Sequence, residues 1–162
     1  MATSNKAQTT LTLSGDREIV ITCVFDAPRA LVFQAYTDPA AIPQWWGPAK
    51  YQATVEQMDV RVGGAWRFLH VGPDGEKYAF HGEYREVVPP EKLVYTFEFE
   101  GFPGHVSVET ITLEERDGKT YVQDITSFDN AADRDGMIQS GMEGGMREAQ
   151  ERLVEYLATR TA

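Results

Sequence analysis

The feature that most constrains the fold is a switch to two-residue hydrophobic alternation between residues 51 and 128. Alternation of this period is typical of β-strands with one buried face. Dipeptides such as Asp74-Gly75 and Asp117-Gly118 interrupt it, and they supply the positive φ angles that tight hairpins need. Consecutive strands with such short connections predict an antiparallel meander. The six predicted strands cover residues 51–58, 60–70, 77–87, 91–99, 105–115 and 119–128.

A different pattern precedes the meander. The β-branched run over residues 17–25 predicts one more strand. Asp26 is then placed to cap a short helix that carries Pro28 in its first turn. Asp38-Pro39 starts a second short helix by the same logic. The prolines therefore predict two short helices rather than one long helix.

Beyond residue 128 the apolar residues recur at helical spacing, which predicts one amphipathic helix of about five turns. Residues 129–136 are expected to form a capping segment with one helical turn before this long helix. An antiparallel sheet with one long helix to cover it gives a two-layer α+β fold of order β-α-α-β6-α. Residues 1–15 are polar and aperiodic, so we expect a flexible N-terminal tail before a single domain over residues 16–162. The apolar stripe of the helix consists of Ile138, Met142, Met146, Ala149, Leu153 and Leu157.

Composition excludes several classes of function. With 162 residues the chain is long enough to bury one sizeable core. Its single cysteine, Cys23, excludes an internal disulfide and a cysteine-based zinc site. A formal net charge of −10 argues against nucleic acid or an anionic membrane as the partner. No apolar run approaches the length of a membrane span, and we expect a cytoplasmic protein.

The segment from Ser140 to Met146 is unusual because it places three glycines in or near the predicted helix. Each helical glycine costs about 1 kcal/mol relative to alanine, so some compensation is expected. One interpretation is that large side chains of the sheet interlock with the missing side chains of the helix. The other interpretation is that the glycines leave space for a ligand pocket with a volume of some hundreds of Å³. The flexible side chains of Met142 and Met146 would then form adaptable walls of this pocket.

The aromatic side chains of the meander would form the opposite wall of such a pocket. Of the adjacent pair Trp45-Trp46, we expect one in the core and the other at a pocket mouth or an interface. Glu109 has the parity of Ile111, which turns its carboxylate inward as a polar anchor, unless a bulge turns it to solvent. The predicted wall residues are Trp46, Trp66, Phe68, Phe80, Tyr95, Phe97, Met142 and Met146.

Residues for catalysis or metal binding are scarce. The three histidines, His70, His81 and His105, lack the i,i+4 partner of a helical metal site. The sequence contains no Gly-x-Ser-x-Gly nucleophile elbow, no phosphate-binding loop and no dinucleotide-binding glycine motif. We therefore predict no catalytic residue, no metal and no cofactor.

Several short motifs occur together between residues 16 and 160, in order and with compatible spacing. They are Asp26-Ala-Pro28, Thr37-Asp-Pro39, Trp45-Trp-Gly-Pro48, Arg61-x-Gly-Gly-x-Trp66, Gly82-x-Tyr84, Pro89-Pro-Glu-Lys-Leu-Val-Tyr-Thr96 and Ser140-Gly-Met-x-x-Gly-Met146. With these motifs the chain resembles the small bacterial proteins similar to the C-terminal domain of the activator of heat-shock protein 90 ATPase, in the START-like, SRPBCC or Bet v 1-like superfamily. The resemblance implies the helix-grip fold, in which a curved antiparallel sheet wraps the C-terminal helix and encloses a hydrophobic cavity.

Three functions are compatible with these observations. The leading hypothesis is non-catalytic binding of a small, largely apolar ligand, lipid-like or aromatic, between helix and sheet. The second is a protein-interaction module of the heat-shock protein 90 co-chaperone type, which would use an exposed Trp45 or Trp46. The third is a polyketide cyclase- or aromatase-like enzyme that uses Glu109 or a cavity-facing histidine for proton transfer.

Overall fold

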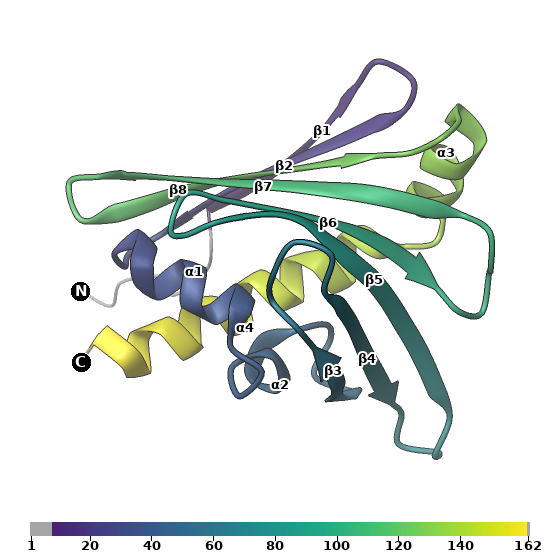
Figure 1. Ribbon diagram of the computed structural model, residues 1–162, viewed down its shortest axis with the longest axis horizontal. Coiled ribbons are helices and arrows are strands. Elements are labelled where there is room, and N and C mark those ends of the chain that lie inside the picture. Colours follow the sequence, from purple (N-terminus) through teal and green to yellow (C-terminus); the bar gives the residue numbers. More distant parts are fainter. Residues whose placement is uncertain (1–7, 162) are drawn as a thin grey trace.

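A computed structural model describes residues 8–161, which form a strongly curved antiparallel sheet with helices on its concave side (Figure 1). The strands are β1 (Gln8–Ser14), β2 (Glu18–Phe25), β3 (Gln52–Met58), β4 (Ala65–Val71), β5 (Lys77–Val88), β6 (Lys92–Phe99), β7 (Val106–Arg116) and β8 (Lys119–Ser127). Their order across the sheet is β1-β2-β8-β7-β6-β5-β4-β3. The last six are the predicted meander, and β2 pairs with β8 at the end of it.

Within these residues the helices are α1 (Arg29–Thr37), α2 (Ile42–Trp45), α3 (Ala131–Gln139) and α4 (Met142–Thr161). The long helix α4 runs along the concave side of the sheet, and α1 and α2 pack against it (Figure 1). This arrangement confirms the predicted α+β helix-grip fold, a curved antiparallel sheet wrapped around the C-terminal helix. None of the helices between residues 8 and 161 is long and apolar enough to span a bilayer.

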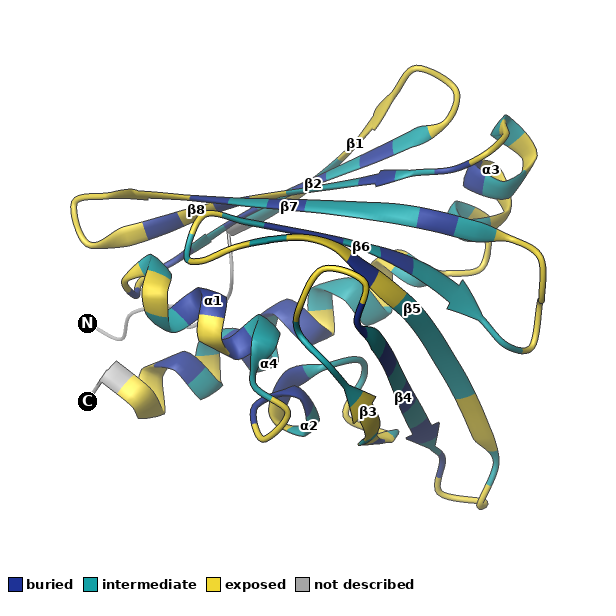
Figure 2. Cartoon of the chain, viewed as in Figure 1, coloured by how far each residue is buried: buried dark blue, intermediate teal, exposed yellow. Residues whose placement is uncertain are grey.

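The core lies between the concave face of the sheet and the helices α1, α2 and α4 (Figure 2). Every second residue of β2 is buried, as expected for a strand with one face turned to the core. Leu93 of β6, Ile111 of β7 and Leu153 of α4 are each no more than 1% exposed. Burying one such side chain contributes about 1.5–3 kcal/mol, so these contacts hold α4 against the sheet.

The prediction of a flexible tail over residues 1–15 is wrong for residues 8–14, which form β1; residues 1–7 lie outside the described residues. β1 pairs with β2 along its whole length, and the Thr9 hydroxyl lies 3.2 Å from Cys23 Sγ. The segment forms an edge of the sheet, where Leu11 packs on buried neighbours and Leu13 is 53% exposed. The alternation of Leu11 and Leu13 with threonines is short, and together with the β-branched content it was the signal for this strand.

The two short helices follow β2, as predicted, but they begin at other residues than expected. Asp26 caps neither of them: α1 begins after Pro28, which makes no side-chain capping bond. Instead the Arg29 backbone N–H donates to the Glu115 carboxylate of β7, 2.8 Å away. A residue distant in sequence thus satisfies a donor that the helix leaves free. Asp38-Pro39 forms a turn rather than a helix start, and α2 begins only at Ile42.

The predicted C-terminal helix is two helices. Gly141 separates α3 from α4 with a φ of +84°, a backbone conformation that glycine adopts without strain. The segment expected to cap the long helix is itself most of α3, and its N-terminus is capped by Asn130, whose side chain accepts from the Asp133 backbone N–H at 2.8 Å. Helical periodicity continues through the break, so spacing alone does not reveal it.

Candidate ligand-binding site

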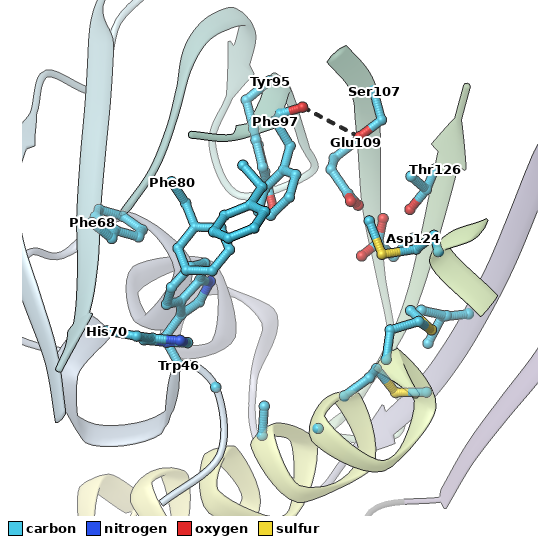
Figure 3. Close-up of a pocket in the computed structure, with 18 of the residues that line it drawn as sticks. Trp46, Phe68, His70, Phe80, Tyr95, Phe97, Ser107, Glu109, Asp124 and Thr126 are labelled. Carbon is cyan, nitrogen blue, oxygen red and sulfur yellow. Dashed lines mark hydrogen bonds between the residues drawn. The ribbon is translucent and has the colours of Figure 1, made fainter. Parts of the chain in front are cut away.

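A cavity of about 540 Å³ lies between the concave face of the sheet and the helices (Figure 3). It has an aromatic wall from β4, β5 and β6, a polar wall from β7 and β8, and a floor from α3 and α4. All nine residues singled out from the sequence line it. They are Trp46, Trp66, Phe68, Phe80, Tyr95, Phe97, Glu109, Met142 and Met146.

The aromatic wall is a network of edge-on rings. Trp46 lies at its centre, with ring centroids 5.1 Å from Phe68 and 5.3 Å from Phe80. Trp66 satisfies its indole N–H by donating to the Thr96 carbonyl at 3.1 Å, so it presents only apolar surface. This contact depends on Gly82, because a Cβ there would lie 1.8 Å from the Thr96 carbonyl oxygen.

The two adjacent tryptophans take different roles. Trp45 is buried, and its indole N–H donates to the Ala35 carbonyl at 3.0 Å, which confirms one tryptophan in the core. Trp46 turns into the cavity. Trp45 is buried and Trp46 is partly buried, so neither is the fully exposed tryptophan that the chaperone hypothesis named.

Three methionines form the floor: Met142 and Met146 of α4 and, not foreseen from the sequence, Met137 of α3. Of the three glycines, only Gly145 borders the cavity. Gly144 is exposed, and a Cβ at its position would meet no atom within 4 Å, while Gly141 serves the break between the helices. The expectation that all three glycines leave room for the cavity is therefore wrong for two of them.

The polar wall holds two carboxyl groups. Glu109 faces inward with Ile111, because β7 pairs with both neighbours without a bulge; the inward orientation is confirmed. Asp124 of β8 lies directly opposite Ile111 and therefore diagonal to Glu109. In Figure 3 the two carboxyl groups point toward one another. The oxygens Glu109 Oε2 and Asp124 Oδ1 are buried and have no hydrogen-bonding partner.

The Asp124 carboxyl holds its proton more tightly than an exposed carboxyl does. Burial raises the pKa of the Asp124 carboxyl well above its ordinary value, and the charge of Glu109 and the hydrogen bond between the two groups raise it further. A hydrogen bond between two carboxyls requires that one of them be protonated. Since the pKa of Asp124 is the one that is raised, Asp124 is the group that holds this proton.

Other polar groups complete the wall. Ser107 donates to the Phe97 carbonyl at 3.5 Å, and Thr126 lies beside the carboxyl pair (Figure 3). Gln150 of α4 is 9% exposed, and its buried Oε1 has no partner. Burial lowers the pKa of His70, so its imidazole is neutral around pH 7, and its Nε2 also lacks a partner.

Asp124, Gln150 and His70 line the cavity but were not among the residues predicted to do so. A signal existed for Asp124, which shares the parity of the buried Val122 and Thr126. Gln150 follows Met146 by four residues and so lies on the same side of α4. A polar side chain is expected in solvent by default, and this expectation fails inside a cavity. Between residues 8 and 161, no three His, Cys, Asp or Glu side chains come together as a metal site.

A family model described as activator of Hsp90 ATPase homolog 1-like protein matches residues 26–158. The chain belongs to this family. The match covers the cavity walls and both short helices, and the family assignment agrees with the resemblance carried by the sequence motifs. No curated protein shows significant similarity to the chain.

Solved structures share the fold of this family member. A solution structure of a protein from Arthrobacter aurescens is 29% identical with a TM-score of 0.86, and the match covers 93% of this chain and 91% of the other. Protein Ms6760 from Mycobacterium smegmatis is 29% identical with a TM-score of 0.83, over 92% and 96%. DynU16, described as a putative protein in the dynemicin biosynthetic locus, is 23% identical with a TM-score of 0.69, over 90% of this chain and 48% of its own. The last likeness concerns the fold alone.

Proposed function

We propose that this protein binds a small, largely apolar ligand in the cavity between α4 and the sheet, without chemical change. The observation that carries the proposal is the cavity itself, about 540 Å³ in volume and lined mainly by aromatic and aliphatic side chains. Volumes of roughly 300–1,000 Å³ are typical of small-molecule sites. A cytoplasmic location belongs to the same proposal.

The lining favours ligands with an aromatic or hydrophobic body. Edge-on rings around Trp46 offer faces and edges for stacking, and each such ring pair contributes about 0.5–1.5 kcal/mol beyond area burial. The floor of Met137, Met142 and Met146 can adapt to different shapes, because methionine side chains are flexible and polarizable. Apolar walls with a few polar groups at one end suit a ligand with one polar group.

Adjacent glycines allow a matched test. Gly145→Phe places a ring at the cavity floor, while Gly144→Phe places the same ring on the exposed side of the same helical turn. A Cβ at Gly145 would meet only Pro48, at 3.5 Å from its Cγ, an ordinary contact, and one at Gly144 meets nothing. Both variants are therefore expected to fold.

The measurement is a fluorescence titration with the neutral probe N-phenylnaphthylamine, whose emission rises in apolar surroundings. We expect wild type and Gly144→Phe to bind the probe equally, and Gly145→Phe to bind it about tenfold or more weakly, since its ring occupies the space. Equal binding by both variants would place the probe elsewhere. Failure of wild type to bind apolar probes of several sizes would refute the proposed function.

A second candidate, the cyclase- or aromatase-like enzyme, is favoured by the buried pair of Glu109 and Asp124, which could accept and return a proton. The test is exchange of the α-protons of the enolisable ketone tetralone in heavy water, followed by proton NMR. An enzyme of this class would accelerate exchange above the buffer rate, and Glu109→Gln would abolish the acceleration. Exchange at the buffer rate would remove this candidate.

A further inference from the structure

The cavity has acidic side chains in its wall and no basic side chain to pair with them. Among the described residues that line it, Glu109 and Asp124 are acidic, and none is a lysine or an arginine. Arg152 of the same helix α4 is occupied elsewhere, since its guanidinium donates to the Gly47 carbonyl at 2.7 Å and to the Pro43 carbonyl at 3.5 Å. A buried charge is costly unless an opposite charge and hydrogen bonds compensate for it.

The other titratable groups around the pair cannot supply a positive charge. Tyr36 of α1 and Tyr95 of β6 are buried next to it, and burial raises the pKa of both phenols. Burial likewise raises the pKa of Tyr84 on β5 and of Cys23 on β2. All four are neutral acids around pH 7. His70, on the aromatic side, is kept neutral because burial lowers its pKa.

The unpartnered polar atoms on this side of the cavity are acceptors. Glu109 Oε2 from β7, Asp124 Oδ1 from β8 and Gln150 Oε1 from α4 are each buried without a partner, and all three side chains line the same space. Gln150 is an independent indication, because it is a neutral side chain about nine-tenths buried with its oxygen unsatisfied. An unsatisfied buried acceptor costs about 1–3 kcal/mol, so a group with several N–H donors would be stabilised here.

We propose that the ligand of this cavity carries a protonated amine, which lies between the Glu109 and Asp124 carboxyls and the Gln150 amide oxygen while its apolar body packs on the aromatic wall. The inference rests on the proposed function and names the ligand class for the same site. An ammonium group has only donors and one positive charge, and so complements the acceptors and the charge of the pair. No third carboxylate or imidazole joins them among the described residues, which favours an organic cation over a metal ion.

Binding of an amine changes the protonation of the carboxyl pair. The ammonium takes the place of the proton that Asp124 holds, so this proton passes to solvent as the amine binds. The amine therefore binds more tightly as pH rises, until the ammonium itself loses its proton. A neutral ligand of the same shape leaves this proton in place.

The test compares three probes with one ring system and different charges: anthracenylmethylamine, anthracenylmethanol and anthracenecarboxylate, substituted at the same ring position. Affinities are measured by isothermal titration calorimetry in phosphate and in Tris, whose ionisation enthalpies differ. We expect the amine to bind at least about tenfold more tightly than the alcohol, the carboxylate to bind weakest, and only the amine to release a proton.

Variants distinguish direct binding of the amine by Glu109 and Asp124 from a general effect of negative charge elsewhere on the protein. Glu109→Gln and Asp124→Asn should each remove most of the preference for the amine over the alcohol. Glu114→Gln is the matched control, because it removes the same charge from an exposed position of β7 and should preserve the preference. Wild-type data alone already decide the question if either variant fails to fold.

The outcomes are distinct. Equal affinity of the three probes, or an amine preference that survives in both variants, would overturn the inference and leave cavity binding intact. If none of the three probes binds to wild type and the neutral probe fails as well, the proposed function falls and the inference falls with it.

Discussion

Asp124 lies two residues before Thr126, the residue opposite Glu109, so the two carboxyls meet diagonally across β7 and β8 on the concave face of the sheet. Diagonal neighbours on antiparallel strands are within reach of side chains of this length. The sheet thereby buries two acidic groups together where a core would ordinarily hold aliphatic residues. This relationship has consequences for both stability and binding.

The first prediction is that Asp124→Asn changes how stability depends on pH. The native pKa of Asp124 is raised above its ordinary value of 3.8, so its contribution is complete below that pH. As pH rises, the unfolded chain loses this proton while the native protein keeps it, and the free energy of unfolding falls by up to about 1.4 kcal/mol per pH unit. The variant should lack this fall and be more stable than wild type around neutral pH, as measured by urea unfolding.

Glu100→Gln is the control, because the stability contribution of Glu100 depends on pH in the opposite direction. Hydrogen bonds from Arg67 and His81 lower the pKa of Glu100 to about 2, so its contribution is present above the ordinary value of 4.5 and is lost as pH falls through about 2. Its removal should cost no more than about 1 kcal/mol around neutral pH, because the pair is partly exposed. Parallel pH profiles for Asp124→Asn and wild type would contradict the buried, protonated state of Asp124.

The second prediction separates the glycines by conformation. Gly144→Ala and Gly145→Ala should each stabilise the protein by about 0.5–1 kcal/mol, because both lie in α4 and neither Cβ meets an atom closer than 3.5 Å. Gly141→Ala should destabilise it by about 1 kcal/mol, since its φ of +84° strains any other residue. Thermal unfolding of the three variants measures the order, and a stabilising Gly141→Ala would contradict the break between α3 and α4.

The third prediction concerns the thiol. Cys23 is 2% exposed, and burial raises the pKa of its thiol to about 11. Because the thiolate is the reactive form, native protein at about pH 8 should resist alkylation by iodoacetamide, while urea-unfolded protein should react completely. Mass spectrometry distinguishes the two states. Rapid alkylation of native protein would mean that the pairing of β1 with β2 does not protect this position.

Sequence patterns predicted the parts of the fold that rest on local chemistry. The meander was recognisable because each hairpin has its own turn residues, and Glu109 was placed correctly because β7 keeps one parity throughout. The edge strand β1 was not predicted because its alternation, Leu11 and Leu13 between threonines, is short and lies in a polar segment. The helix break at Gly141 was not predicted, because the helical spacing of apolar residues continues across it.

The candidate site was predicted only on its apolar side. Aromatic residues indicate an inward face, but a buried acid such as Asp124 looks like a surface residue until its neighbours are known. The charge state of the pair depends on β7, β8 and the absence of a cationic side chain among the described lining residues, which are properties of the assembled sheet. No spacing within one strand contains that information.

The fourth prediction tests the central claim most directly, through NMR of isotope-labelled methionine methyl groups during titration with N-phenylnaphthylamine. Three of the five methionines, Met137, Met142 and Met146, line the cavity, while Met58 does not line it and lies opposite Trp66 on the neighbouring strand; Met1 lies outside the described residues. Aromatic ring currents should shift the three cavity methyl resonances in a saturable manner and shift that of Met58 less. Saturable binding that shifts Met58 and none of the three would contradict a ligand site between α4 and the sheet.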